Sequence, residues 1–538
     1  MLDKLSPNQR LIVAVVLSVV FFVGYTAIFP PAEPKMAKEN AKVALDSKKD
    51  VTTRVEEASG HAIAAQEKVS NSASSNIVTI KNDKFILKID TLGRISSKEL
   101  LEDKFRNDDN LHAQVIPSTG TKPLYIRFAD DAINDEATKT AYTASVQDVT
   151  LKDTPVTVTL TQKLSALTVT KVLTFYSDGH YDAKISTSKD VRHYIYLGDR
   201  PQVSKKLMAV AGALIYGGDD VAHIIEDGDA EGRKIFQDVK LASSFDQYTA
   251  IILYGFNKDT NIIVERGHKD NPVVYFDARQ TENIHGYIGP KEHKILKAIN
   301  PYLTNAIEYG WFTFAAKPLF ALLSWLHGIF GNWGWSIIAL TALIRAVLYP
   351  LTYKGMVSMQ KMKLLAPKLK ELKEKHAKDP QRLNAATMEM YKKNGANPLG
   401  GCLPMILQIP VFFALYRTLL NAVELQGAPW LLWINDLSRM DPYYVLPILM
   451  GASMFLQQRM TPSNFTDPLQ EKVFKYLPVI FTFFFVTFPS GLVLYWFTNN
   501  LFSIAQQYIV NQQFANAKDA QAVKEAQVVI DDTKNEKK

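Results

Sequence analysis

Apolar residues are concentrated in two parts of the chain, with a long mixed segment between them. An uncharged apolar run extends from Leu11 to Phe29, and several more follow after about Leu319. Because about 20 apolar helical residues cross the hydrocarbon core of a bilayer, these runs predict membrane spans. The chain-wide 47% hydrophobic and 21% charged content averages over unlike regions. The pattern predicts a multi-pass α-helical membrane protein with a large water-soluble domain.

The first apolar run is preceded by Lys4 and Arg10. A cleavable signal peptide is one interpretation, but the run is longer than a typical signal core and ends without an Ala-x-Ala cleavage site. We therefore predict a retained N-terminal membrane anchor at residues 1–30, with its N-terminus in the cytoplasm. Residues 31–75 are rich in Ala, Lys, Glu and Ser and poor in aromatic residues, which predicts a flexible linker.

Residues 76–308 show short apolar runs with alternating polar positions, separated by Gly, Asp and Asn. Examples are Phe85 to Ile89, Val156 to Leu160 and Ile251 to Tyr254. Such runs predict strands, and many of them in one segment indicate an all-β sandwich. The segment has no GxSxG, HExxH or GxxxxGK[ST] motif, and its histidines lack metal-ligand spacing. We predict a binding or spacing module, with a sugar or peptide cleft as the alternative.

Residues 309–332 contain one helix with an apolar face. Lys317, Ser324 and His327 lie opposite that face, and Pro318 stands at a plausible first helical position. We predict an amphipathic helix in the membrane interface; the alternative is a helix packed on the soluble domain. The apolar face consists of Leu319, Leu322, Leu323, Leu326, Ile329 and Phe330.

Five further apolar runs bring the predicted number of spans to six. They lie at Trp333 to Tyr353, Leu403 to Leu420, Val445 to Leu456, Tyr476 to Phe488 and Gly491 to Val510. The corresponding predicted segments are span 2 at 333–353, a cytoplasmic basic helical hairpin at 354–397, spans 3 to 6 with short loops at 398–512, and a polar cytoplasmic tail at 513–538.

Charges between the spans set the expected orientation. Residues 354–394 contain eleven Lys and Arg against four Asp and Glu, whereas residues 421–442 contain one Arg against three acids. Basic loops stay in the cytoplasm, so the first segment is predicted inside and the second outside. The β domain is then outside, and both chain termini are cytoplasmic. The single cysteine, Cys402, excludes an intrachain disulfide and a Cys-based zinc site.

Within the basic segment, apolar residues recur at helical spacing on both sides of Asp379 and Pro380, which predicts an antiparallel hairpin. Its positive charge favours contact with anionic lipid or ribosomal RNA. A solvated loop that only fixes the topology is the alternative. The predicted contact residues are Lys368, Lys370, Lys373 and Lys375.

Arg345 lies inside an otherwise apolar run. A guanidinium in the middle of a bilayer costs about 3 kcal/mol on insertion scales, so it is a functional candidate. Thr341 and Thr352 share its helix face, and Gln408 and Asn499 interrupt other spans. No acidic residue lies in these runs, which disfavours a closed ion pair. The pattern predicts that Arg345 faces water or the carboxylate of a bound molecule.

Three motifs follow one another along the second half of the chain. They are NPLGGCLPMILQIP at Asn397 to Pro410, DPYYVLPILMG at Asp441 to Gly451, and FPSGLVLY at Phe488 to Tyr495. With an arginine in the preceding span, they closely resemble the YidC/Oxa/Alb family of membrane protein insertases. The resemblance extends from about Trp311 to Gln513. The N-terminal anchor and β domain match the Gram-negative form of that family.

The resemblance implies an insertase and membrane chaperone of the bacterial inner membrane, with its large domain in the periplasm. In the family, a positively charged groove receives a client segment and releases it into lipid. The resemblance assigns groove positions to Arg345, Thr341, Gln408, Phe412, Tyr495 and Trp496, and we add Asn499 as a polar neighbour. Trp496 stands where a second tyrosine is expected. The tail is charge-balanced, unlike the basic tails of some members.

The implied partners are nascent membrane protein clients, the Sec translocon, the ribosome and anionic phospholipid. No catalytic residue, cofactor, metal or small-molecule substrate is expected. The alternative function is a secondary transporter in which the intramembrane arginine binds an anionic solute, although no inverted repeat of broken helices is visible. A third interpretation is an assembly scaffold that uses only the β domain.

Overall fold

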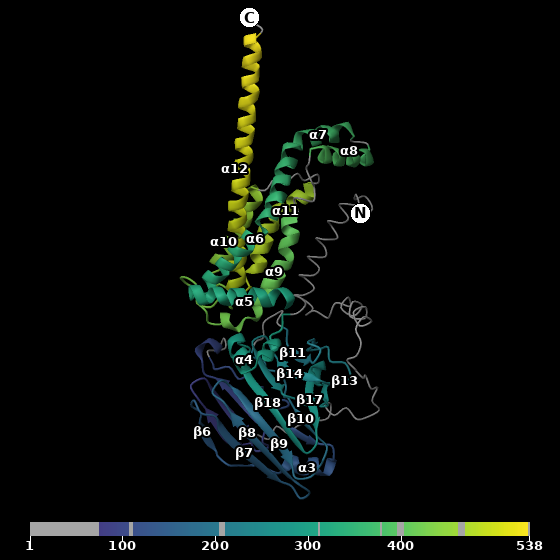
Figure 1. The fold of residues 1–538 in the computed structure, drawn as a ribbon, viewed down its shortest axis with the longest axis vertical. Coiled ribbons are helices and arrows are strands. Elements are labelled where there is room, and N and C mark those ends of the chain that lie inside the picture. The colour runs from purple at the N-terminus through teal and green to yellow at the C-terminus, as the bar shows by residue number, and fades with distance from the viewer. Residues whose placement is uncertain are drawn as a thin grey trace.

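The computed structural model describes residues 75–106, 111–203, 210–309, 313–376, 379–394, 403–460 and 468–535. The predicted anchor at 1–30 and nearly all of the predicted linker at 31–75 lie outside the described residues. The described chain forms a β domain followed by a helical bundle (Figure 1).

The described strands of the β domain form three sheets. In spatial order, the nine-stranded sheet contains β12 (Ala222–Glu226), β11 (Gly212–Gly217), β14 (Val239–Phe245), β15 (Thr249–Tyr254), β18 (Thr281–Pro290), β9 (His180–Thr187), β8 (Thr168–Phe175), β7 (Val156–Lys163) and β5 (Thr143–Ala144). The five-stranded sheet contains β13 (Arg233–Phe236), β16 (Ile262–Arg266), β17 (Pro272–Ala278), β10 (His193–Tyr196) and β4 (Ile126–Phe128). The four-stranded sheet contains β3 (Ile95–Leu100), β2 (Phe85–Asp90), β1 (Asn76–Lys81) and β6 (Asp148–Thr150).

The three sheets share one hydrophobic core. Successive side chains on a strand point to opposite faces, and β8 alternates half-buried and buried positions along its whole length. Ile89, Phe276 and Ile288, each from a different sheet, belong to the same buried cluster. The predicted runs at residues 85–89, 156–160 and 251–254 fall within β2, β7 and β15. Buried positions alternate with half-buried or exposed ones in β2 and β7, whereas the run in β15 is buried throughout except at Tyr254.

The domain is β-rich but not all-β, because short helices complete it. They are α3 (Asp131–Lys139), α4 (His293–Ile299), η2 (Asp103–Phe105), η3 (His268–Asp270) and η4 (Pro301–Ala306). Leu296 of α4 and Leu303 of η4 pack with Leu241 and Phe245 of β14 in a second core. These helices have at most nine residues, and helices this short are marginal on their own, so they depend on packing against the sheets.

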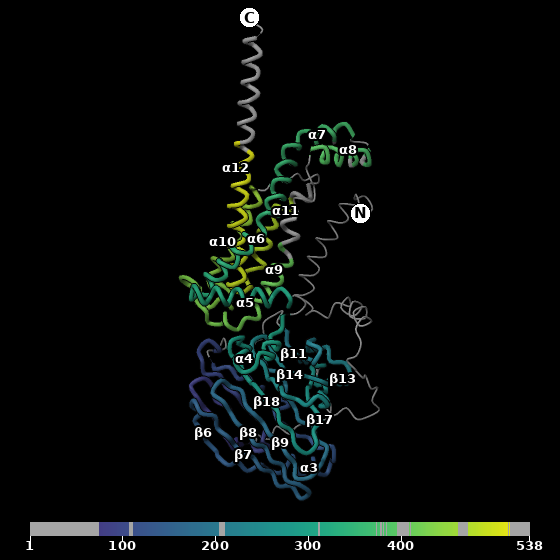
Figure 2. The backbone as a smooth tube through the Cα atoms, viewed as in Figure 1, coloured from purple at the N-terminus to yellow at the C-terminus, as the bar shows by residue number. Residues whose placement is uncertain are grey.

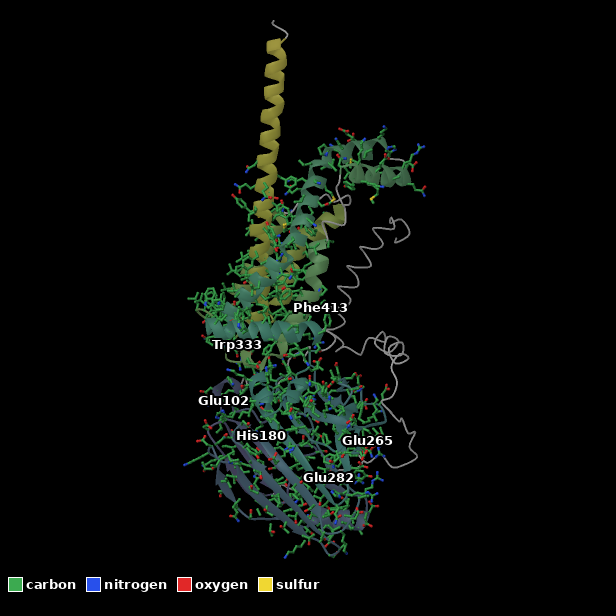
Figure 3. All side chains as sticks on the ribbon, viewed as in Figure 1. Glu102, His180, Glu265, Glu282, Trp333 and Phe413 are labelled. Carbon is green, nitrogen blue, oxygen red and sulfur yellow. The ribbon has the colours of Figure 1, made fainter. Side chains whose placement is uncertain are left out.

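The bundle consists, in its described residues, of helices that continue from the β domain. They are α5 (Thr313–Phe330), α6 (Trp333–Leu364), α7 (Ala366–Lys375), α8 (Pro380–Lys393), α9 (Leu403–Asn421), η7 (Val423–Leu425), α10 (Val445–Met460), α11 (Pro468–Phe485) and α12 (Ser490–Asn535). Among the described helices, α5 and α6 have the length and composition needed to cross a membrane. The side chains of the bundle and the β domain are drawn in Figure 3, where Phe413 marks the bundle and Glu282 the β domain.

Helix α5 lies across the end of the bundle that faces the β domain (Figure 1). Phe320, Leu323 and Leu326 are buried in a cluster that includes residues of α6 and α9. Trp325 and Ile329 on the same helix are 60% and 59% exposed. One apolar side of α5 thus packs against the bundle, while other apolar side chains remain uncovered by protein.

The hairpin of α7 and α8 lies at the end of the bundle opposite the β domain (Figure 2). Helix α6 continues without a break past Tyr353, where the predicted span ends, to Leu364. Asp379 is the N-cap of α8, and its side chain accepts a hydrogen bond from the backbone N–H of Arg382 at 3.0 Å. The Asp-Pro pair therefore begins the second helix of the hairpin.

Residues 422–444 connect α9 to α10 and contact the β domain; we call them the docking loop. Val423 of this loop is buried within the main core cluster of the β domain. Two hydrogen bonds lie just before it in the chain: Gln247 Nε2 donates to the carbonyl of Leu420 at 2.7 Å, and Asn421 Nδ2 donates to the carbonyl of Glu308 at 2.7 Å. The β domain and the bundle are therefore joined by buried packing as well as by the chain.

Candidate functional site

Helix α12 presents a stripe of polar side chains to the other bundle helices. Tyr495, Asn499 and Ser503 are spaced four residues apart, so they lie on one helix face. All three are buried. We call these three residues the polar stripe. Each forms a hydrogen bond to a side chain of α6 or α9.

Arg345 of α6 is held by the polar stripe. Its Nε donates to Asn499 Oδ1 at 2.7 Å, and its Nη2 donates to the backbone carbonyl of Asn499 at 3.2 Å. Nη2 also donates to Ser503 Oγ. The guanidinium is therefore fixed along one edge by acceptors from a single helix.

The acceptors around Arg345 are uncharged. Within the described part of the chain, no Asp or Glu forms an ion pair with this residue. Neither α6 nor residues 490–510 of α12 contain an acidic residue. Since arginine stays protonated, the site keeps a net positive charge that hydrogen bonds compensate only in part.

The predicted residues on α9 face the same helix. Gln408 Nε2 donates to Tyr495 Oη at 2.6 Å. The rings of Phe412 and Trp496 meet edge to face, with centroids 4.8 Å apart and an interplanar angle of 82°. Aromatic pairs favour this geometry, which brings the positive edge of one ring to the negative face of the other. Helix α12 thus joins α6 through the arginine and α9 through these two pairs.

Thr341 is placed differently from the other predicted residues. Its hydroxyl donates to the carbonyl of Ile337, one turn earlier in its own helix, at 2.7 Å. The side chain is buried. Its hydroxyl hydrogen is therefore used within α6, and the hydroxyl oxygen can still accept a hydrogen bond.

Several polar contacts of the bundle were not predicted from sequence. Ser503 was missed because single serines are common in membrane helices, although its spacing from Tyr495 and Asn499 was a usable signal. Gln506 Nε2 donates to Thr352 Oγ1 at 2.7 Å, which continues the α6–α12 seam by another turn. Asn500 Nδ2 donates to Ser453 Oγ of α10 at 3.0 Å.

Comparison with known proteins identifies the family. The family model for the 60Kd inner membrane protein matches residues 325–518, and the model for the YidC periplasmic domain matches residues 253–322. The chain is 45% identical over 525 residues to the membrane protein insertase YidC of Wolinella succinogenes, which covers 97% of this chain and 98% of the relative. The YidC of Campylobacter jejuni is 43% identical, over 95% and 97% of the two chains.

The chain belongs to the YidC family of membrane protein insertases.

A solved structure described as an active YidC insertase with the first transmembrane domain resolved covers 81% of this chain and 95% of its own, with 19% identity and a TM-score of 0.36. Membership of the YidC family places the chain in the inner membrane and its β domain in the periplasm. The proteins that it inserts are its partners.

The predicted contact lysines of this YidC-family chain lie on α7. Lys368, Lys370 and Lys375 are exposed, and the side chain of Lys373 lies outside the described residues. Leu365 and Leu369 are buried on the opposite side of this segment. The hairpin therefore presents positive charge to solvent at the end of the bundle farthest from the periplasmic domain (Figure 2).

A second arginine of the bundle, Arg417 in α9, was not singled out from the sequence. Burial raises the pKa of Glu226 in β12, and the charge of Arg417 opposes this rise, so Arg417 lies near the β domain. Among the described residues, no group of three or more His, Cys, Asp or Glu side chains is arranged to hold a metal ion.

Proposed function

We propose that client segments enter a hydrophilic groove between α6, α9 and α12 and leave it sideways into the lipid bilayer. The observation that carries this proposal is the guanidinium of Arg345, which has only uncharged hydrogen-bond partners among the described residues. The groove residues are those named from sequence: Arg345, Thr341, Gln408, Phe412, Tyr495, Trp496 and Asn499.

The proposed topology has six spans with both termini in the cytoplasm, and α5 in the outer interface. Its support is the opposite placement of the periplasmic β domain and the basic hairpin at the two ends of the bundle (Figure 1). The exposed apolar side chains of α5, such as Trp325 and Ile329, suit contact with lipid.

Burial of the client's apolar segment in lipid supplies the driving force, at about 0.8 kcal/mol for each methylene group removed from water. The barrier comes from the polar segment that must pass the hydrocarbon. In the groove, hydrogen-bonding side chains replace part of its hydration, and the charge of Arg345 attracts acidic groups. The protein thus lowers the barrier and leaves the driving force to the client.

Helix α10 shortens the path further in this proposal. Its 16 residues measure about 24 Å at 1.5 Å per residue, against about 30 Å for the hydrocarbon core. A short span is accommodated by local thinning of the bilayer.

We further propose that the α7–α8 hairpin contacts ribosomes or anionic phospholipid through Lys368, Lys370, Lys373 and Lys375, and that the protein works alone or with the Sec translocon. The positive charge of the hairpin and its distance from the periplasmic domain support the contact with ribosomes or anionic phospholipid.

The test compares paired single-span clients that differ only in an acidic or neutral translocated segment. With wild-type protein reconstituted in vesicles, both clients insert.

Arg345→Ala should lose insertion of the acidic client, and Arg345→Glu should lose it more completely. Arg345→Lys should retain much of this insertion because the charge remains. Arg417→Ala is the matched control, because this arginine lies close enough to the β domain to act on Glu226. Its loss should affect both clients alike. Equal loss of both clients in Arg345→Ala contradicts the electrostatic proposal. Uptake of an anionic solute by the same vesicles, without insertion, supports the transporter alternative.

A further inference from the structure

We infer that Asn499 and Ser503 are positioning residues that orient the guanidinium of Arg345, so that its Nη1 is the nitrogen that meets a client's carboxylate. This inference rests on the proposed function of Arg345. It adds which nitrogen of Arg345 contacts the client's carboxylate and which residues orient that nitrogen.

The distribution of hydrogen bonds over the guanidinium carries the argument. The group has five N–H donors: one on Nε and two on each Nη. Nε binds Asn499 Oδ1, and Nη2 binds the Asn499 carbonyl and Ser503 Oγ. Both Nη2 hydrogens and the Nε hydrogen therefore have acceptors on α12. Within the described residues, Nη1 donates no hydrogen bond to protein.

The two acceptor residues, Asn499 and Ser503, are also hydrogen-bonded to each other. Ser503 Oγ donates to the backbone carbonyl of Asn499 at 2.9 Å, and it accepts from Arg345 Nη2. The same Asn499 carbonyl accepts from Nη2 at 3.2 Å. These bonds close a ring of donors and acceptors. Rotation of the guanidinium breaks several of them together, so the orientation is rigid.

This orientation leaves one edge for the client. An arginine with free edges binds a carboxylate through two parallel hydrogen bonds, along the Nε–Nη2 edge or between the two Nη atoms. The first edge is occupied by Asn499 and Ser503. A client carboxylate is then held from the Nη1 side, by fewer bonds than a free arginine offers. Weak binding suits a site that must release each client into lipid.

The first variant is Asn499→Asp, which tests whether the charge of Arg345 must stay unpaired. Aspartate has the size of asparagine and places a carboxylate within hydrogen-bond distance of Nε, so it pairs with the guanidinium and offsets its charge. Insertion of the acidic client should fall about tenfold or more, the effect of losing about 1.4 kcal/mol of stabilisation. Insertion of the acidic client should fall more than insertion of the neutral client, so the ratio of the two is the readout, and thermal stability in detergent is measured beside it.

Ser503→Ala and Ser503→Thr provide a second pair that introduces no charge. Alanine removes the acceptor of Nη2 and should reduce insertion of the acidic client by a few-fold, whereas threonine keeps a hydroxyl and should restore it. Asn500→Asp is the matched control for the added charge. This neighbour faces Ser453 of α10, so any loss there should be the same for both clients.

The outcomes separate the inference from the proposed function. If Arg345→Ala selectively loses the acidic client while Ser503→Ala inserts both clients normally, the positioning role is wrong and the groove charge stands. If Asn499→Asp also inserts both clients normally, the role of the unpaired charge is wrong as well. If the two α12 variants lose both clients together with thermal stability, their role is only structural and the inference is overturned. If Arg345→Ala shows no client preference, the inference and the proposed function are both wrong.

Discussion

Glu424 of the docking loop accepts a hydrogen bond at 2.9 Å from the backbone N–H of His293, the first residue of α4. This bond joins the bundle to the β domain beside a second polar pair, Lys104 Nζ with Glu292 Oε1 at 2.6 Å. Burial raises the pKa of Glu424 to about 7, and the nearby charge of Glu292 acts in the same direction. The hydrogen bond from His293 and the charge of Lys104 oppose this rise.

The junction should therefore weaken as pH rises. The pKa of the Glu424 carboxyl is higher in the docked state than its ordinary value of 4.5, so its protonation stabilises docking. This contribution is fully present at pH values below 4.5 and is lost as pH rises through about 7. The upper limit of the effect is about 3 kcal/mol, at about 1.4 kcal/mol per pKa unit. Thermal unfolding in detergent from pH 5 to 8 should show a smaller pH dependence for Glu424→Gln than for wild type. Glu389→Gln, an exposed change on α8, is the control and should follow wild type.

Gly451 of α10 should not tolerate a side chain. A Cβ added there would lie 1.8 Å from Thr482 Oγ1 and 3.1 Å from Thr482 Cβ of α11. Gly451→Ala should therefore destabilise the bundle by about 1–3 kcal/mol, the usual range for overpacking. Thr482→Ala in the same chain should recover much of the loss.

The control for this prediction is Gly328→Ala in α5, where an added Cβ meets nothing within 4 Å. Unfolding temperatures of the purified variants provide the measurement. A Gly451→Ala protein as stable as Gly328→Ala would show that α10 and α11 do not approach so closely.

The hydrogen bond between Gln408 and Tyr495 should couple α9 to α12. Tyr495→Phe removes the acceptor of Gln408 Nε2 and should lower stability by about 1 kcal/mol. In a double-mutant cycle with Gln408→Ala, the combined loss should be smaller than the sum of the single losses. Tyr508→Phe, at a 60% exposed position of α12, is the matched control and should have little effect. Additive effects would contradict the bond.

Reversing the charge of the hairpin should weaken its contacts. Replacing Lys368, Lys370, Lys373 and Lys375 by glutamate should reduce co-sedimentation with anionic vesicles or ribosomes, most strongly at low salt, because the attraction is screened by ions. The control reverses the same number of exposed lysines on the β domain: Lys152, Lys163, Lys184 and Lys189. Unchanged binding at low salt would leave the hairpin lysines with a role in topology alone.

The sequence was sufficient to identify features that depend on local periodicity. Strand alternation located β2 and β7, a short continuous apolar run located β15, and helical spacing on both sides of Asp379 and Pro380 located α7 and α8. The charge of Arg345 in an apolar run marked it as a candidate without any knowledge of its neighbours. These signals depend on residues near one another in the chain, so they can be recognised without the tertiary structure.

Features that depend on tertiary contacts were not predicted. Ser503 became important only when α12 was seen beside α6. The docking role of Val423 was hidden because the loop sequence gives no sign of the distant core that receives it.

Val423 has a consequence for exchanging parts between family members. The residue belongs by sequence to the connection between two bundle helices, yet its side chain completes the core of the β domain. A chimera that joins the β domain of one species to the bundle of another at residue 309 would therefore divide a single packing unit. Such a chimera should fold well only if the docking loop is transplanted together with the β domain. Among relatives, substitutions in the docking loop and in the β-domain core around Val423 are expected to occur together.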